Sequence, residues 1–219
     1  MWSTKLMVKE MLRHAPFTVF GAATGIVVML IIIYFDVPGD ISNVLFYILH
    51  PLHVVLSALV TTAMYRLYGR GNIWLAIIIG YTGSVVVAAV SDSVIPFLGG
   101  TLLHIPMELE LPFMETAKMP YIGIAKWQVV NSAALIGIAI GYLKPVTRFP
   151  HSIHVLLSTW ASLFGFTAFG IANWIPLLPY VFLFLFLAVW IPCCFSDIIY
   201  PLLWIKGKRE GNTVPENQS

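Results

Sequence analysis

The sequence predicts an all-α, polytopic membrane protein with six transmembrane helices, and three observations support this fold class. Of the 219 residues, 59% are hydrophobic and 10% are charged, and the mean hydropathy is +0.88. A soluble domain carries about 25% charged residues. Six apolar stretches are long enough to cross roughly 30 Å of hydrocarbon at about 1.5 Å per helical residue. Basic residues flank alternate ends of these stretches, as is typical of multi-pass proteins.

The six predicted helices are residues 16–35, 43–65, 73–98, 121–143, 152–175 and 177–204. The first is an uncharged run of 20 residues without a small-residue cleavage site behind it, so it is expected to stay in the mature chain rather than act as a signal peptide. Residues 1–15 are interpreted as a cytoplasmic segment and 101–120 as an outer loop. The polar residues 205–219 are interpreted as a disordered cytoplasmic tail.

The positions of lysine and arginine predict the orientation of the chain. Only Lys118 and Lys126 lie on one side of the predicted helices. The other ten basic residues lie on the opposite side: Lys5, Lys9, Arg13, Arg66, Arg70, Lys144, Arg148, Lys206, Lys208 and Arg209. Because basic residues favour the cytoplasmic side, both termini are predicted to be cytoplasmic. The net charge of +2 reflects this bias and not a basic stripe, so nucleic acid is not an expected partner.

Two motifs occur twice, in the same order. SDSVIPFL (91–98) recurs as SDIIYPLL (196–203), and HPLHVVLS (50–57) recurs as HSIHVLLS (151–158). The chain is therefore predicted to contain two three-helix units, residues 16–100 and 121–204. Since three spans is an odd number, the second unit would cross the bilayer in the opposite sense, as an inverted repeat.

Small residues recur at corresponding positions of the two units. The first predicted helix contains GAATG (21–25), and the fourth contains GIAIG (137–141). Small residues four positions apart let two helices approach closely. These faces are a candidate interface for a homo-oligomer within the lipid bilayer.

The SD-x-x-x-P motif predicts an ion-binding site in each unit. Pro96 and Pro201 have no N–H to give to the carbonyl four residues earlier, which belongs to Asp92 or Asp197. Each motif would present a carboxylate, a freed carbonyl and a serine hydroxyl. The alternative is that both acids lie near helix ends and reach water. The predicted ion-binding residues are Asp92, Asp197, Ser91, Ser196, His53 and His154.

The repeated histidines add candidate metal ligands. Residues three and four apart share one face of a helix, which groups His50, His53 and Ser57, and equally His151, His154 and Ser158. Imidazole and carboxylate groups bind divalent transition metals and also relay protons. Counting along the helices places the first group in the outer half of the bilayer and the second in the inner half. The predicted metal-binding residues are His50, His53, Asp92, His151, His154 and Asp197.

These features predict a small secondary transporter or channel for a cation, either a divalent metal or one whose movement is coupled to protons. One alternative is an intramembrane enzyme with a catalytic divalent transition metal, which is disfavoured because the predicted ligands are split between leaflets. Another is a structural subunit of a membrane complex. No catalytic residue is assigned, and Cys193 and Cys194 are interpreted as small packing residues without chemistry.

Overall fold

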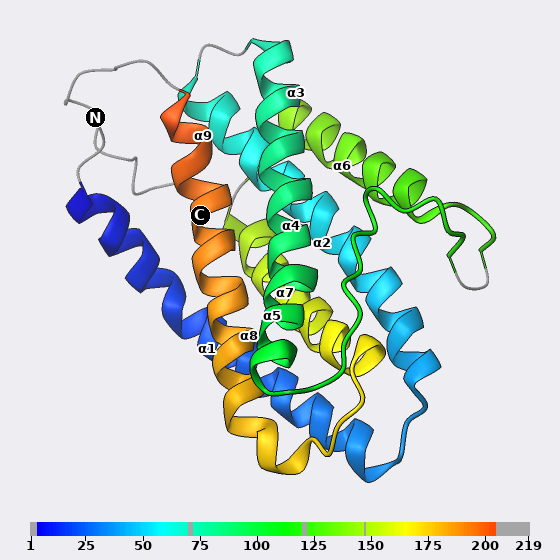
Figure 1. The fold of residues 1–219 in the computed structure, drawn as a ribbon. Coiled ribbons are helices and arrows are strands. Elements are labelled where there is room, and N and C mark those ends of the chain that lie inside the picture. Colours follow the sequence, from blue (N-terminus) through cyan, green and yellow to red (C-terminus); the bar gives the residue numbers. More distant parts are fainter. Residues whose placement is uncertain (1–3, 70–71, 120–121, 147, 205–219) are drawn as a thin grey trace.

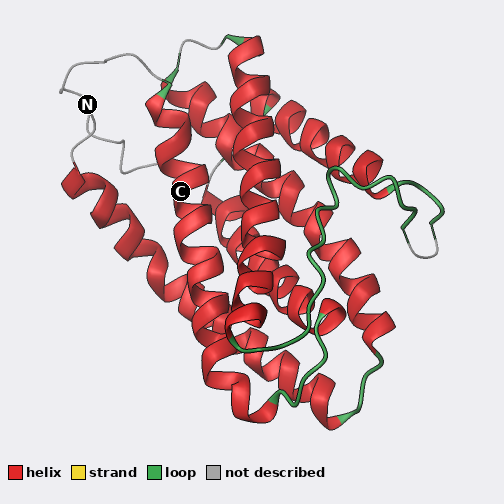
Figure 2. Ribbon diagram, in the orientation of Figure 1, coloured by secondary structure: helices red, strands yellow, loops and turns green. Residues whose placement is uncertain are grey.

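The protein is an all-α bundle, as the sequence predicts (Figures 1 and 2). The computed structural model describes residues 4–69, 72–119, 122–146 and 148–204, and no strand occurs in these ranges. The predicted tail, 205–219, lies outside the described residues. The side of the membrane on which the termini lie stays a prediction.

The third and sixth predicted helices are each continuous but change register along their length. The first two helices are α1 (Thr4–Tyr34) and α2 (Gly39–Tyr68), and the fourth and fifth are α6 (Lys126–Leu143) and α7 (Arg148–Phe169). The third comprises α3 (Ile73–Tyr81), the π-helix η1 (Thr82–Val86), α4 (Val87–Ala89), the π-helix η2 (Val90–Val94) and α5 (Ile95–Leu102). The sixth comprises the 3₁₀ turn η3 (Ile175–Leu177), α8 (Leu178–Cys194), the π-helix η4 (Phe195–Ile199) and α9 (Tyr200–Leu203).

Five spans among the described residues are long and apolar enough to cross a membrane: His14–Tyr34, Gly39–Tyr68, Ile73–Leu102, Ser152–Phe169 and Ile175–Leu203. The fourth predicted helix, α6, is not among these five; it has 18 residues and is polar in its first two turns, at Lys126, Gln128 and Asn131. The loop before α6 runs along the bundle, so α6 begins part-way along its length (Figure 1). The multi-pass fold is confirmed, with α6 as its shortest helix among these six.

Helices α2 and α7 form the centre of the bundle. They pack against each other, with α1 against α7 and α8 on one side and α6 against α2 and α3 on the other. Large apolar side chains such as Phe20, Leu143 and Leu183 are at least half exposed on the outside, a surface suited to contact with lipid. The polar residues that are fully buried gather in α2, α7 and the π-helices.

The two small-residue faces bring helices of the same chain together. A Cβ at Gly21 would lie 2.8 Å from Thr159 Oγ1 of α7. In the same way, Gly137 lies against the backbone of Val55 and Gly141 against the backbone of Leu59, both in α2. These glycines therefore set the close approach of α1 to α7 and of α6 to α2. The homo-oligomer stays a prediction.

Candidate ion-binding site

Four side chains form a continuous polar chain through the centre of the bundle. Asp92 Oδ2 lies 2.7 Å from His53 Nδ1, His53 Nε2 lies 2.7 Å from His154 Nε2, and His154 Nδ1 lies 2.8 Å from Asp197 Oδ2. His50 Nδ1 lies 2.9 Å from Asp92 Oδ2 and adds a branch at one end. The four residues of the chain are 0% exposed. The histidines come from α2 and α7, and the acids come from η2 and η4.

The repeated histidines meet in one place, so the expectation of two separate half-sites at different depths is wrong. The prediction counted residues from the expected helix ends, which gave His53 and His154 different depths. Because α2 and α7 pack against each other, those two residues come side by side despite the unequal count. Their rings stack with centroids 4.6 Å apart.

A π-helical turn carries each repeated aspartate. In a π-helix the N–H of a residue bonds to the carbonyl five residues earlier, and such turns are frequent at functional sites. Ile95 N–H bonds to Val90 O, and Tyr200 N–H bonds to Phe195 O. The next residue in each case is the proline, so in this register the carbonyl without a helical donor belongs to Ser91 and to Ser196.

The prediction places the carbonyl that proline frees at the aspartate, whereas the π-helical register also leaves the carbonyl of the preceding serine without an N–H from proline. Ser162 of α7 donates its hydroxyl to Ser91 O at 2.9 Å, which supplies the missing hydrogen bond. Thr61 of α2 lies 3.5 Å from Ser196 O, a weaker contact at the corresponding place. Both main-chain oxygens thus interact with a hydroxyl from a neighbouring helix rather than facing an open ion site.

Hydroxyl groups also surround both carboxylates. Ser91 Oγ donates to Asp92 Oδ1 at 2.6 Å, and Ser162 Oγ lies 3.4 Å from the same atom. Thr61 Oγ1 lies 3.4 Å from Asp197 Oδ1. Thr61 and Ser162 stand at corresponding positions, each eight residues after the second histidine of its motif, His53 in α2 and His154 in α7. Each acid therefore contacts the histidine of its own predicted unit and a hydroxyl of the other unit.

Ser196 and His50 lie beside the polar chain. Ser196 Oγ donates to Gly83 O at 2.5 Å and lies 3.3 Å from Thr61 Oγ1, so this serine joins the network through its neighbours. His50 contacts Asp92 but is not one of the chain's four residues. The backbone of His151 is part of α7, whereas its side chain lies outside the described part of the structure.

The hydrogen bonds of the histidines determine what their facing nitrogens can do. An ionised carboxylate only accepts hydrogen bonds, so His53 and His154 each donate Nδ1–H to an aspartate. With those protons in place, both Nε2 atoms carry lone pairs, and two lone pairs 2.7 Å apart repel one another. A shared proton or a bound cation removes this repulsion. Histidines that ligate a metal commonly donate their other N–H to a carboxylate in this way.

Cys193 of α8 completes a group that the sequence analysis missed. Its Sγ lies 4.0 Å from His53 Nε2 and 3.5 Å from Ser158 Oγ. His53, His154 and Cys193 each offer one possible ligand atom, and these three atoms lie within 4.8 Å of one another. All three residues are buried. One sequence signal was available, since Cys193 precedes Asp197 by four residues and so shares its helix face.

A second polar cluster ties the long loop to the bundle. Lys126 Nζ donates to Glu110 Oε2 at 2.8 Å and to Glu115 Oε2 at 2.7 Å, and Tyr47 donates to Glu110 at 2.7 Å. Partial burial alone would raise the pKa of Glu110, but hydrogen bonds involving Glu115, Lys126 and Tyr47 lower it. Burial and the hydrogen bond with Glu110 raise the pKa of Glu115. Both carboxylates are therefore engaged with Lys126, which ties the loop to the start of α6.

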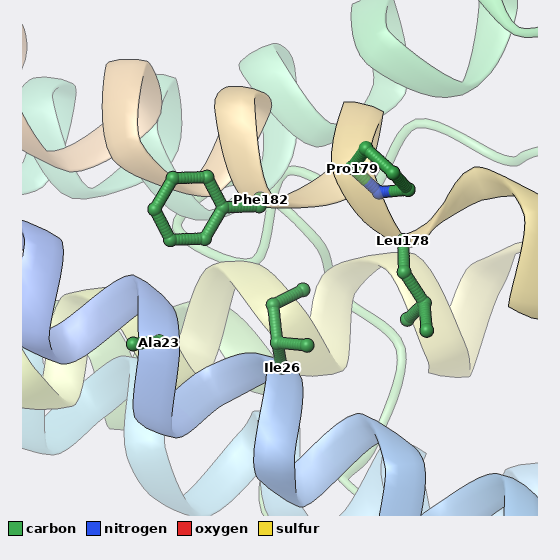
Figure 3. Close-up of a pocket in the computed structure, with 5 residues that line it drawn as sticks. All are labelled: Ala23, Ile26, Leu178, Pro179 and Phe182. Carbon is green, nitrogen blue, oxygen red and sulfur yellow. The ribbon is translucent and has the colours of Figure 1, made fainter.

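A shallow apolar groove lies between α1 and α8 (Figure 3). Ile26 projects from α1 and Leu178 from α8 into the space between the two helices. None of its lining residues carries a charge or belongs to the polar chain. The lining consists of Ala23, Ile26, Leu178, Pro179 and Phe182. The groove therefore offers no ligand for a cation.

In comparisons with family models, curated proteins and solved structures, no match to this chain was found.

Proposed function

We propose that this protein is a small secondary transporter for a cation, and that the ion binds at the Nε2 atoms of His53 and His154 in exchange for protons. The observation that carries the proposal is the buried chain Asp92–His53–His154–Asp197. Ionisable residues inside a membrane bundle are costly and commonly mark ion pathways or proton relays. Here four of them meet at the centre of the fold.

The chemistry of the histidines supports competition between a proton and a metal ion. Each Nδ1–H is held by an aspartate, which fixes the tautomer and makes Nε2 more basic. The same lone pairs can take up a proton or coordinate a metal, so binding one ion displaces the other. A site of this kind couples the movement of a metal in one direction to the movement of protons in the other.

Several contacts support an inverted repeat of two three-helix units. Helix α1 packs against α7 and α8, and its proposed counterpart α6 packs against α2 and α3. Thr61 reaches Asp197, and Ser162 at the corresponding position reaches Asp92. Transporters built from inverted repeats bind their ions at the interface between the repeats. The junction of His53 with His154 lies at such an interface.

One observation favours a second candidate, an intramembrane metal-dependent enzyme. The sequence analysis disfavoured this class because the ligands were expected in different leaflets, yet His53, His154 and Cys193 gather at one point. An enzyme would convert a substrate without moving the ion across the bilayer. Uptake of the ion into sealed vesicles therefore separates the two candidates.

The proposal is tested with purified protein in proteoliposomes that contain a zinc indicator and a pH indicator. We expect Zn²⁺ uptake with a counterflow of protons. Asp92→Asn and Asp197→Asn should each lower the uptake by about tenfold or more, because the amide no longer holds a histidine tautomer through a charged acceptor. Asp40→Asn is the matched control, since Asp40 is exposed at the start of α2 and should leave uptake unchanged. Normal uptake in either buried-acid variant contradicts the proposal.

A further inference from the structure

We infer that Cys193 is a third ligand of the ion, so that the transported cation is a thiophilic divalent transition metal of the Zn²⁺ type. This inference rests on the proposed function and narrows its substrate class. It depends on the position of one sulfur relative to two imidazole nitrogens, all inside the bundle.

Two separations between the donor atoms are close to those of a zinc site. Zinc bonds of about 2.05 Å to nitrogen and about 2.3 Å to sulfur, in tetrahedral geometry, separate two nitrogens by roughly 3.3 Å and a nitrogen from a sulfur by roughly 3.6 Å. The corresponding distances here are 2.7 Å between the Nε2 atoms and 4.0 Å between Cys193 Sγ and His53 Nε2. Shifts of about half an ångström would bring these two separations to the zinc values, and the ligand atoms of all three residues lie within 4.8 Å of one another.

The type of donor selects the class of metal. Thiolate and imidazole favour Zn²⁺ and similar ions, whereas Mg²⁺ and Ca²⁺ require oxygen ligands. Asp92 and Asp197 contact the Nδ1 atoms of the histidines, whereas the Nε2 atoms face each other and Cys193 Sγ lies 4.0 Å from His53 Nε2. The arrangement therefore disfavours hard cations even though two carboxylates are near.

A simple packing role for Cys193 is the competing explanation. Cys193 packs with Val155 and Val189, and a small apolar residue would fill that place. The adjacent Cys194 is also buried but is not part of the donor group. The two cysteines thus form a matched pair in which only the first should affect metal binding.

The test is a titration of the purified full-length protein in detergent with Co²⁺, which reports thiolate ligation through a sulfur-to-metal charge-transfer band. We expect this band in the wild type, its displacement by Zn²⁺ and no displacement by Mg²⁺. Cys193→Ser should remove the band and weaken Zn²⁺ binding by about tenfold or more. Cys194→Ser should retain both properties. Cys193→Ala serves as a second variant if the serine variant fails to fold.

The outcomes distinguish this inference from the proposed function. If Co²⁺ binds without the band, or if Cys193→Ser and Cys193→Ala keep full Zn²⁺ affinity, Cys193 is not a ligand although the cation site stands. A band lost equally in Cys194→Ser also overturns the assignment. If the wild type neither binds Co²⁺ nor takes up Zn²⁺, both the assignment and the proposed function are wrong.

Discussion

A single glycine sets how closely α7 approaches the repeated aspartate. A Cβ built on Gly165 would lie 2.6 Å from the carbonyl oxygen of Asp92 and 3.6 Å from Pro96 Cβ. The first distance is well inside van der Waals contact, so any side chain here forces α7 away from η2. Since Ser158 and Ser162 on the same helix contact Asp92, this displacement would also disturb the acid.

We predict that Gly165→Ala lowers the thermal stability of the protein and weakens Zn²⁺ binding. Alanine is the better helix former by about 1 kcal/mol, but overpacking of a tight site costs about 1–3 kcal/mol and should outweigh this gain. Gly39→Ala is the control, because nothing lies within 4 Å of its added Cβ. Thermal unfolding and calorimetric titration in detergent measure both effects. An alanine variant at 165 with unchanged unfolding and binding would show that the contact is relieved at no cost.

At the scale of the helix, each of the two π-turns that carry an aspartate contacts a hydroxyl from another helix. Ser162 donates to Ser91 O at 2.9 Å, at the place where Pro96 has no N–H to offer. Removing this hydroxyl leaves a buried carbonyl without that donor, which costs about 1–3 kcal/mol. An alanine at position 96 restores an N–H that can serve the same oxygen.

We therefore predict that Pro96→Ala reduces the destabilisation caused by Ser162→Ala. The two single variants and the double variant form a cycle whose coupling is measured by unfolding in detergent. Pro201→Ala with Thr61→Ala is the matched cycle, and its coupling should be smaller because Thr61 lies 3.5 Å from Ser196 O. Strictly additive costs at positions 96 and 162 would mean that the proline shapes packing rather than hydrogen bonding.

The sequence predicts an α-helical register around each proline, whereas the structure has a π-helical register there. This difference shows what the sequence can and cannot predict. Hydropathy was sufficient for the helices, and the repeated motifs identified His53, His154, Asp92 and Asp197. A proline indicates that one carbonyl loses its N–H donor. Whether the neighbouring hydrogen bonds join residues four or five positions apart depends on partners such as Ser162, which belongs to another helix. That partner is distant in sequence, so the π-turns were not predictable from the local motif.

The contribution of Cys193 was missed for a related reason. Alignment of the two SD motifs places Ala88 at the position that corresponds to Cys193, so the repeat offered no support for the cysteine. The depth of His53 relative to His154 was also wrong, because the packing of α2 against α7 cannot be counted along one helix. Sequence periodicity assigns a face of a helix, whereas the meeting of two faces is a property of the bundle.

At the scale of the whole molecule, the proposed site would carry the same net charge with and without its ion. Asp92 accepts hydrogen bonds from His50 and His53, and Asp197 accepts one from His154, so both acids are stabilised as carboxylates. Without the ion, two carboxylates and one proton shared by the facing nitrogens leave a single net negative charge. With the ion, the net charge is again −1, because a divalent metal offsets two of the three negative charges of the carboxylates and the Cys193 thiolate.

This balance predicts that two protons leave for each Zn²⁺ that binds, one from the shared histidine pair and one from the Cys193 thiol. Transport would then move no net charge, so Zn²⁺ uptake into proteoliposomes should not respond to an imposed membrane potential. Cys193→Ser supplies no second proton, because a serine hydroxyl does not ionise near neutral pH. That variant should release one proton per ion in a weakly buffered titration, and an inside-negative potential should accelerate its remaining uptake. Cys194→Ser should behave as the wild type in both measurements.

Acceleration of wild-type uptake by the potential, or release of a single proton, would show that the thiol keeps its proton and that the charges of the occupied site are balanced in another way.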